Sequence, residues 1–534
     1  MSLTQRKQPV PPPVVTLMAK AWRAINQRHH WGIAGLAIVL LGVVAEPVWA
    51  QDGGATGVDA LFAPIVDVMA LVLFFPIGGE NGFPFIVLWL FVAALFFTLR
   101  LGFINVRGFK HAVEVVRGKY DDPHDEGEVS HFQALATAVS GTVGLGNIAG
   151  VAIAIQLGGP GAMVWLTLAG FCGMVTKFVE CSLAVKYRRI ENDGTVLGGP
   201  MYYLTRGLTP KGMRPLGQGL AVLFSLLCLG ASLGGANMFQ SNQAYAAISS
   251  LIPGLPAWLF GLILAALAGF VIIGGIRRIG AVAEKLVPAM AAIYAIACLF
   301  VIGANLGQVP AAIGTILREA FAPTAAVGGV VGVMVQGIRR SSFSNEAGVG
   351  SAPIAHAAAR TDEHIREGIV ALLEPFIDTI IICNMTAITI VLTGVYQDTG
   401  TELSGVAMTA NAFATVIDWF PIVLSIAVCL FAFSTIISWS YYGIQAWAYL
   451  FGDRTTIVFK IIYVVCTFLG CLTSLGVIID FSDLMLLGMA FPNLVGCYIL
   501  SNEIAGDLKD YWQRLSSGEM RAYEPVAVSS SERS

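Results

Sequence analysis

Glycine interrupts two long apolar segments of this sequence, and both interruptions can expose backbone groups that bind ions. The first covers residues 140–150 and reads SGTVGLGNIAG, and the second covers residues 343–353 and reads FSNEAGVGSAP. Glycine runs weaken a helix. A helix that restarts at Leu145–Asn147 would direct free N–H groups and the positive end of its dipole at a carboxylate. Unwound carbonyls can accept from an ammonium group or coordinate sodium, so such a break suits a zwitterion.

The two interruptions occupy corresponding positions in the chain. Each opens a block of five apolar segments, and the charges of the connecting loops orient the two blocks oppositely. Unwound backbone at membrane depth is tolerated only where it is packed in protein or lines a cavity. Paired broken helices in oppositely oriented halves indicate a transporter with inverted repeats. The alternative is that the glycines only let helices pack closely.

Polar side chains inside other apolar segments add candidate binding groups. Ser434 and Thr435 present adjacent hydroxyls, and sodium is a hard cation that prefers oxygen ligands. Gln240 carries an amide where an unpaired amide costs free energy. Each group has a structural alternative: hydroxyls can bond back to the preceding helical turn, Gln240 can join two helices, and Trp439 can pack in the core or against lipid.

Eleven apolar segments of spanning length must position these groups. They cover residues 82–101, 131–157, 162–186, 218–248, 256–275, 285–304, 326–357, 366–394, 419–449, 456–476 and 482–502. About 20 apolar residues cross the hydrocarbon of a bilayer. Only helices satisfy their backbone locally there, and short alternating strands are absent from the sequence, so we predict an all-α fold.

Loop charges orient the predicted helices. Lys and Arg gather in the loops near residues 107–119, 186–214, 277–285, 360–366 and 454–460 and in the tail. The opposite loops contain Arg318 alone. The positive-inside rule therefore makes the first set, and the C-terminus, cytoplasmic. The long outer loop 303–325 is expected to carry a short interfacial helix.

The ends of the chain differ from the apolar middle. Residues 1–50 combine a basic start, a short apolar stretch and a small-residue site, which describes a signal peptide cleaved after Ala50, with an uncleaved anchor as the alternative. We expect a periplasmic amphipathic segment at 51–81, helical over 58–77, a transporter domain at 82–503 and a cytoplasmic tail at 504–534.

Composition excludes several functional classes. The chain is 56% hydrophobic and 12% charged, with a mean hydropathy of +0.74, so its solvent must be lipid. A net charge of −3 without basic clusters gives no sign of nucleic-acid binding. All nine cysteines lie in apolar segments without a CxxC, which excludes a disulfide framework and a zinc site of usual spacing.

Several ionisable residues fall within the predicted spans, where charge is costly and is usually paired. Lys177 and Glu180 are one helical turn apart, which favours a pair between them. His356 is expected to be packed, and Arg339 and Arg340 either gate the outer vestibule or pair with an acid such as Glu346.

Longer motifs resemble the alanine or glycine:cation symporter family. They are Val143 to Gly150 with Gly158-Gly159-Pro160-Gly161-Ala162, Gly198-Gly199-Pro200-Met201-Tyr202-Tyr203-Leu204, Asn237 to Asn242, Gly337 to His356, and Phe431 to Thr435 with Trp439. The similarity runs from about residue 82 to 503. Leu145, where many members have Thr, and Trp165, the remnant of an aromatic run, depart from the pattern.

The resemblance implies a leucine-transporter-like five-plus-five inverted repeat with one extra N-terminal helix. It implies that the substrate meets Gly141, Thr142, Leu145, Gly146, Gln240, Phe343, Ser344, Asn345 and Trp439. It also implies a sodium site made of the hydroxyls of Ser434 and Thr435 and the carbonyls of Ser140, Val143 and Phe431.

The sequence therefore predicts a sodium-coupled symporter that imports small neutral amino acids such as alanine and glycine across a bacterial inner membrane. We expect no cofactor beyond the coupling sodium ion, and a monomer in the lipid bilayer. The nearest alternative is proton coupling in the same fold, which would need a titratable group where Ser434 and Thr435 stand. An intramembrane enzyme is disfavoured because no HExxH motif and no His-rich span occur, and paired breaks with a bulky Trp do not resemble a channel filter.

Overall fold

The computed structural model describes residues 66–79, 82–122, 124–321, 329–397, 405–416, 418–473, 476–520 and 522, without the side chains of 476–480. The chain divides into two units, Met1–Ile65 and Val66–Ser534, and every described residue belongs to the second. The predicted signal peptide or anchor, the first part of the 51–81 segment and most of the last residues of the tail lie outside the described residues.

Long apolar helices dominate the described unit. Six are long and apolar enough to cross a membrane: α9 (Ala162–Lys186), the run Arg214–Leu251, α14 (Gly275–Ala304), the run His364–Thr393, α22 (Phe420–Phe451) and Phe481–Ser517 of α24 (Gly476–Ser517). The predicted all-α, multi-span fold is confirmed. The predicted count of eleven spans is not, because helices such as α4 (Phe85–Arg100), α13 (Ala257–Ile273) and α23 (Thr456–Gly470) are short.

Two of these runs change helical geometry along their length. The first joins α11 (Arg214–Leu233) through the π-helical turn η2 (Gly234–Met238) to α12 (Phe239–Leu251). The second joins α18 (His364–Ala371), α19 (Leu373–Pro375), the π-helical η4 (Phe376–Cys383) and α20 (Asn384–Thr393). Single π turns inside α-helices are frequent at functional sites because they widen the backbone locally.

The first predicted break is present. Helix α7 (His131–Thr142) starts at a capping box in which Ser130 and Gln133 exchange side-chain-to-backbone hydrogen bonds of 3.2 and 3.1 Å. It ends before Val143, which has an extended backbone. The chain resumes as the π-helical η1 (Gly146–Gly150) and α8 (Val151–Gly158), bent by 52° from α7.

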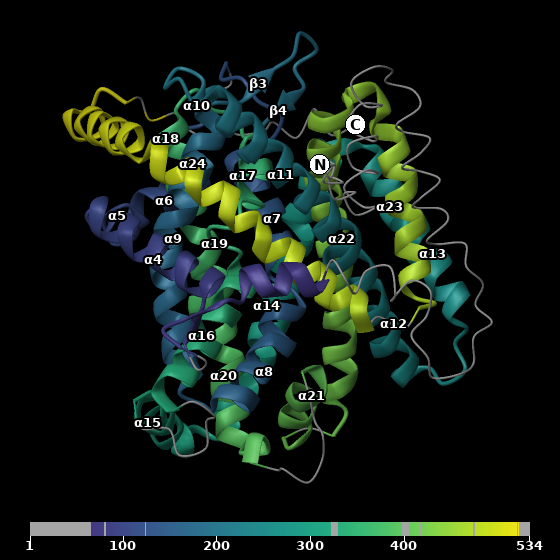
Figure 1. Cartoon of the computed structure of the whole chain (residues 1–534). Helices are drawn as coiled ribbons and strands as arrows, with labels where there is room; N and C mark the ends of the chain where they lie inside the picture. Colours follow the sequence, from purple (N-terminus) through teal and green to yellow (C-terminus); the bar gives the residue numbers. More distant parts are fainter. Residues whose placement is uncertain are drawn as a thin grey trace, which may run out of the picture. The chain divides into compact units, whose positions relative to one another are not determined.

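The second predicted break is present as well. Helix α16 (Gly329–Asn345) ends before Glu346, whose φ of 53° is left-handed, and α17 (Ala352–His356) follows after Gly348 and Gly350 with φ of 85° and 92°. Only glycine adopts such angles without strain. Figure 1 shows α8 below α7 but α17 above α16, so the two broken helices run in opposite directions. This is the arrangement that the predicted repeat requires.

Short elements connect the helices. Two antiparallel hairpins pair β1 (Pro76–Ile77) with β2 (Phe83–Pro84) and β3 (Arg189–Ile190) with β4 (Val196–Leu197). The helices α5 (Ile104–Arg107), α6 (Phe109–Val116), α10 (Pro200–Leu208), α15 (Val309–Glu319) and α21 (Val406–Ala414) lie between spans, with 3-10 turns at Leu306–Gln308, Val395–Gln397 and Asp453–Thr455. Helix α15 is the short helix predicted in loop 303–325.

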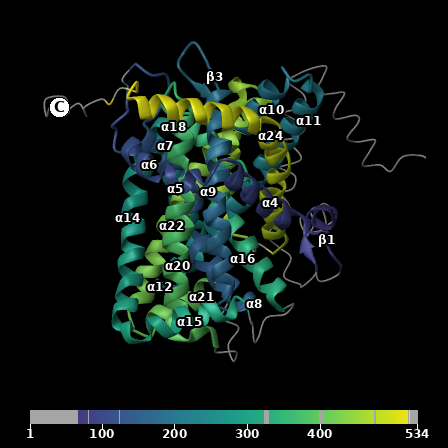
Figure 2. The same cartoon turned by 90° about the vertical axis from the view of Figure 1, so that its left-hand side faces the viewer.

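The loops divide between two ends as the charge pattern predicts. Figure 1 shows β3, β4, α10 and α18 towards one end, and α15 and α21 at the other. Figure 2 shows α14 and α22 running between these ends, and the last part of α24 lying across the first. We call the end with β3, β4 and α10 the basic end, because its loops hold most of the Lys and Arg.

Buried ions in the described unit pair over long sequence distances. Lys177 Nζ contacts Glu374 Oε1 at 3.0 Å, and both side chains are fully buried. Glu180 instead accepts from Asn493 Nδ2 at 2.7 Å. The predicted Lys177–Glu180 pair is therefore wrong. A buried ammonium needs close contact with its carboxylate, and Glu374 on the facing helix offers it.

Candidate functional site

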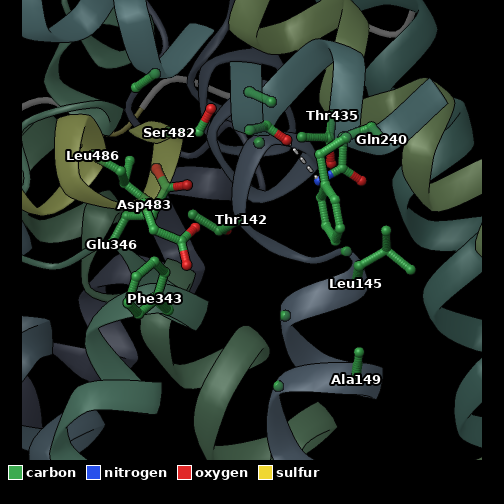
Figure 3. Close-up of a pocket in the computed structure, with 18 of the residues that line it drawn as sticks. Thr142, Leu145, Ala149, Gln240, Phe343, Glu346, Thr435, Ser482, Asp483 and Leu486 are labelled. Carbon is green, nitrogen blue, oxygen red and sulfur yellow. Dashed lines mark hydrogen bonds between the residues drawn. The ribbon is translucent and has the colours of Figure 1, made fainter. Parts of the chain in front are cut away.

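A cavity of about 460 Å³ lies between the two broken helices. Figure 3 shows Leu145, Gln240 and Thr435 on one side of it, and Phe343, Glu346, Ser482, Asp483 and Leu486 on the other, with Thr142 beside Asp483 and Glu346. The residues that line it are Gly141, Thr142, Gly144, Leu145, Gly146, Ala149, Gly150, Ile153, Ala231, Gly235, Ala236, Phe239, Gln240, Arg339, Arg340, Phe343, Glu346, Thr435, Trp439, Ser482, Asp483 and Leu486.

Most of the residues predicted to meet a substrate share this cavity. Those that line it are Gly141, Thr142, Leu145, Gly146, Gln240, Phe343 and Trp439. Ser344 and Asn345 do not line it. Their hydroxyl and amide groups instead take part in hydrogen bonds behind the breaks, with Asp378, Ser341 and Thr379.

The first break brings backbone close to the facing helix. A Cβ on Gly144 would lie 3.1 Å from Thr435 Oγ1, so a larger residue would push α22 away. The Gly144 N–H donates to Asn147 Oδ1 at 2.8 Å. Asn147 thereby shapes the turn that leads into η1, and Leu145 and Gly146 face the cavity directly after it. Backbone polar groups at a helix start can bind an anionic group there.

Gln240 presents an unused acceptor to the cavity. Its Nε2 donates to the Gly235 carbonyl at 3.3 Å, across the π-helical η2. Its Oε1 is buried, and no hydrogen-bond donor in the described part of the chain reaches it. A buried acceptor without a partner costs free energy unless a ligand supplies the donor.

Aromatic rings limit the cavity on two sides. Trp439 is 1% exposed, and its ring meets that of Tyr442 edge-on with centroids 5.2 Å apart. Phe343 lies at the end of α16, with the Arg340 guanidinium 5.7 Å from its ring centroid. Rigid rings at both sites restrict the size of any side chain that the ligand carries.

Four of the five residues predicted to hold sodium gather where α22 crosses α7. Ser434 Oγ lies 2.8 Å from the Phe431 carbonyl and 3.4 Å from the Ser140 carbonyl, and Thr435 Oγ1 lies 3.2 Å from the same Ser140 carbonyl. Ser140 Oγ donates to the Ser434 carbonyl at 2.8 Å. The fifth residue, Val143, has no described hydrogen bond to these oxygens. The Val143 N–H donates to the Val139 carbonyl of α7.

The chemistry of this oxygen cluster fits a small monovalent cation. It contains two hydroxyls and two carbonyls without a carboxylate, all within α7 and α22. The hydroxyls now donate to carbonyls, so a bound cation would have to take the place of these hydrogen bonds. Sodium would be the natural ligand of such a neutral oxygen set.

The sequence singled out Glu346 but not Ser482 and Asp483, which line the far side of the cavity with it. Ser482 and Asp483 come from α24, and Glu346 from the second break. Ser482 is 2% exposed, and its buried hydroxyl has no hydrogen-bond partner among the described residues. The sequence signal for Ser482 and Asp483 was two adjacent polar residues at the start of an apolar segment. Polar residues at that position ordinarily mark the point where a span leaves the membrane, so they did not stand out.

A polar junction ties the two breaks together behind the cavity. The fully buried Asp378 of η4 accepts from Asn147 Nδ2 at 2.6 Å and Ser344 Oγ at 2.7 Å, which come from the first and second breaks. Thr379 Oγ1 donates to it at 2.8 Å. We call Asn147, Ser344, Asp378 and Thr379 the Asp378 junction. One carboxylate thus fixes the spacing of both interruptions.

Comparison with known proteins places these features in a family. A model of the sodium:alanine symporter family matches residues 78–525. The sodium/alanine symporter AgcS of Methanococcus maripaludis is 39% identical over 80% of this chain and 94% of its own. The probable sodium/glutamine symporter GlnT of Bacillus subtilis is 36% identical over 80% and 87%. YrbD of Bacillus subtilis, provisionally a sodium/proton-dependent alanine carrier protein, is 34% identical over 81% and 90%.

Among solved structures, the chain resembles that of MhsT in complex with L-phenylalanine. The identity is 14% and the TM-score 0.46, with 71% of this chain and 99% of that chain covered.

The Asp378 junction predicts a specific loss of stability. Asp378→Asn puts an amide N–H₂ among three donors, so at least one donor loses its acceptor, at a cost of roughly 1–3 kcal/mol. We expect this fall in the free energy of unfolding of the protein in detergent. Asp510→Asn is the control, because Asp510 is exposed and pairs with Arg514 within α24, where such pairs contribute only about 0.5 kcal/mol. Equal, small effects of both substitutions would show that the junction does not hold the breaks.

Proposed function

The chain belongs to the sodium:alanine symporter family, and from this premise we propose that it imports small neutral amino acids, alanine and glycine above all, with sodium. Members of this family are multi-pass membrane proteins that act as cation-coupled amino-acid symporters. The chain is therefore a transporter rather than an enzyme. The substrate, the coupling ion and the residues that bind them are proposed from the cavity and from the oxygen cluster of α7 and α22.

The single observation that carries the substrate proposal is the unpartnered Oε1 of Gln240, which lines the cavity on the same side as Leu145. A zwitterion offers one anionic and one cationic end. The backbone at Leu145 and Gly146 suits the carboxylate, and the Gln240 oxygen suits the ammonium. Thr142 and Gly141 lie beside them, and Phe343 and Trp439 restrict the side chain to a small one. We propose that Ser344 and Asn345 do not contact the substrate but hold the second break in position through their hydrogen bonds outside the cavity.

The coupling ion is proposed to be sodium, held by Ser140, Phe431, Ser434 and Thr435, with the carbonyl of Val143 as a further ligand. The neutral oxygen cluster supports sodium over a proton, because none of its groups titrates near neutral pH. One relative is described with both sodium and protons, so proton coupling stays the second candidate.

Membrane placement is inferred from the charge pattern. We propose a bacterial inner membrane with the basic end and the C-terminus in the cytoplasm. Residues 1–50 act as a signal peptide or anchor, residues 51–81 lie in the periplasm, residues 82–503 form the transporter domain and residues 504–534 form a cytoplasmic tail. We further propose that the monomer transports substrate without a cofactor.

Uptake into proteoliposomes tests the proposal. Labelled alanine should accumulate when sodium is present only outside, and unlabelled glycine should compete. Leucine and phenylalanine should not compete, because the cavity must close around its substrate and the rigid rings of Trp439 and Phe343 then limit the side chain. Accumulation driven by a proton gradient without sodium would refute sodium coupling, and competition by leucine would refute the size limit.

Gln240→Leu should weaken alanine binding by about tenfold or more, because an ammonium hydrogen then lacks an acceptor, at roughly 1–3 kcal/mol. Isothermal titration of purified protein measures the dissociation constant. Gln445→Leu is the matched control: Gln445 is also buried and also has an unpartnered Oε1, yet it lies outside the cavity. A dissociation constant unchanged in Gln240→Leu would mean that this amide only joins helices.

The double change Ser434→Ala with Thr435→Ala should abolish sodium dependence. Linkage requires that sodium tighten alanine binding and alanine tighten sodium binding by the same factor. In the double variant we expect the alanine affinity with sodium to equal the affinity without it. Ser440→Ala on the same helix serves as the control, since its hydroxyl bonds back to Ile437 at 2.6 Å. Uphill, sodium-driven uptake by the double variant would place the ion elsewhere.

A further inference from the structure

Two buried histidines flank one buried carboxylate between the cavity and the basic end. His131 Nδ1 contacts Glu367 Oε2, and His356 Nδ1 lies 2.5 Å from Glu367 Oε1. His131 stands at the start of α7, His356 at the end of α17, and Glu367 in α18. All three side chains are at most 2% exposed. We call them the His–Glu–His triad, and through it one carboxylate touches both broken helices.

The other ring nitrogens of these histidines also face carboxylates. His131 Nε2 lies 3.8 Å from Asp121 Oδ1, and His356 Nε2 lies 3.9 Å from Glu374 Oε2. Neither Nε2 has a hydrogen-bond partner in the part of the chain that the structure describes. A neutral imidazole has one N–H, which the contact with Glu367 uses. Its remaining lone pair would then point at a carboxylate, an arrangement that a second proton on the ring would relieve.

The charged groups around the triad do not replace these protons. On α9, Lys177 is engaged with Glu374 at 3.0 Å, and Glu180 accepts from Asn493. Arg188 donates to the carbonyls of Ala357 and Ala359. Within ion-pair distance, the described cationic partners of Glu367 are the two imidazoles. A fully buried carboxylate needs such neutralisation.

The triad lies in the layer that separates the cavity from the basic end. No residue of α17 or α18 lines the cavity, and every residue of the two helices except His364 is buried. Backbone hydrogen bonds also join the chain before α7 to the chain after α17: Glu128 N–H donates to Ala358 at 2.9 Å, and Arg360 N–H donates to Val129 at 2.7 Å. A substrate that leaves through the basic end requires this layer to separate.

We propose that the His–Glu–His triad is a proton-binding site, distinct from the substrate cavity, whose protonation holds the inner halves of the two broken helices together. Loss of one proton, from an imidazolium nitrogen to water past the half-exposed Asp121, leaves a lone pair facing a carboxylate and weakens the contact between α7 and α17 through α18. The inner layer then separates more readily. This inference rests on the proposed symport, but not on the identity of the coupling ion.

Exchange of labelled for unlabelled alanine in proteoliposomes, at equal pH and saturating sodium on both sides, tests the site. We expect the wild-type rate to rise by about tenfold between about pH 5.5 and 8, the effect of losing one charge-assisted hydrogen bond over the range where imidazoles titrate. His356→Gln and His131→Gln should exchange at a rate independent of pH. His111→Gln, which removes a buried histidine bonded to Tyr511 at 2.7 Å, should keep the wild-type slope.

A wild-type slope in His356→Gln and His131→Gln would overturn the proposal. If these variants do not fold, hydrogen exchange of the wild-type protein in detergent decides the matter. The protection of amides in residues 352–371, corrected for the chemical exchange rate, should fall as the pH rises through the same range. Protection that does not change with pH would refute the site. This measurement needs no transport, so it separates failure of the triad from failure of the proposed symport.

Discussion

The hydrocarbon of a bilayer offers no water to a backbone N–H or carbonyl, and this constraint governs where the chain can leave helical geometry. Both interruptions lie where side chains supply the missing partners. Asn147 bonds the Gly144 N–H and, with Ser344, donates to Asp378. The cavity therefore exists because one buried carboxylate stabilises two stretches of unwound backbone from behind. The groups left free of this network, at Leu145, Gly146 and Gln240, are those that face the cavity.

The distribution of charge across the described unit obeys the same constraint. In the oxygen cluster of α7 and α22, where we propose that the coupling ion binds, every group is a neutral oxygen, which keeps the cost of an empty site low. Towards the basic end, buried carboxylates pair with basic side chains: Glu374 with Lys177, and Glu367 with His131 and His356. Such pairs stabilise only while the geometry is close, so they favour one arrangement of the helices strongly over others.

Much of this was predictable because the signals are local. Glycine runs and polar residues in apolar segments located both breaks, Gln240, and the hydroxyls of Ser434 and Thr435. Long-range partners were not predictable. Ser344 was expected in the cavity, but its hydroxyl donates to Asp378 on another helix. Lys177 was expected to pair with Glu180 one turn away, but it pairs with Glu374 on a facing helix. Ser482 and Asp483 were missed because polar residues at the start of a span ordinarily mark its exit from the membrane.

The volume of the cavity has a consequence for solvent. At about 460 Å³ it is far larger than one small amino acid, so water must fill the remainder whenever substrate is bound in the state described. Closing the cavity around the small substrate that we propose then requires most of that water to leave. Each turnover is in this sense a partial dehydration, and its equilibrium depends on the activity of water. Solutes excluded from the protein surface should shift the protein towards its closed, dry form without touching any residue that binds substrate.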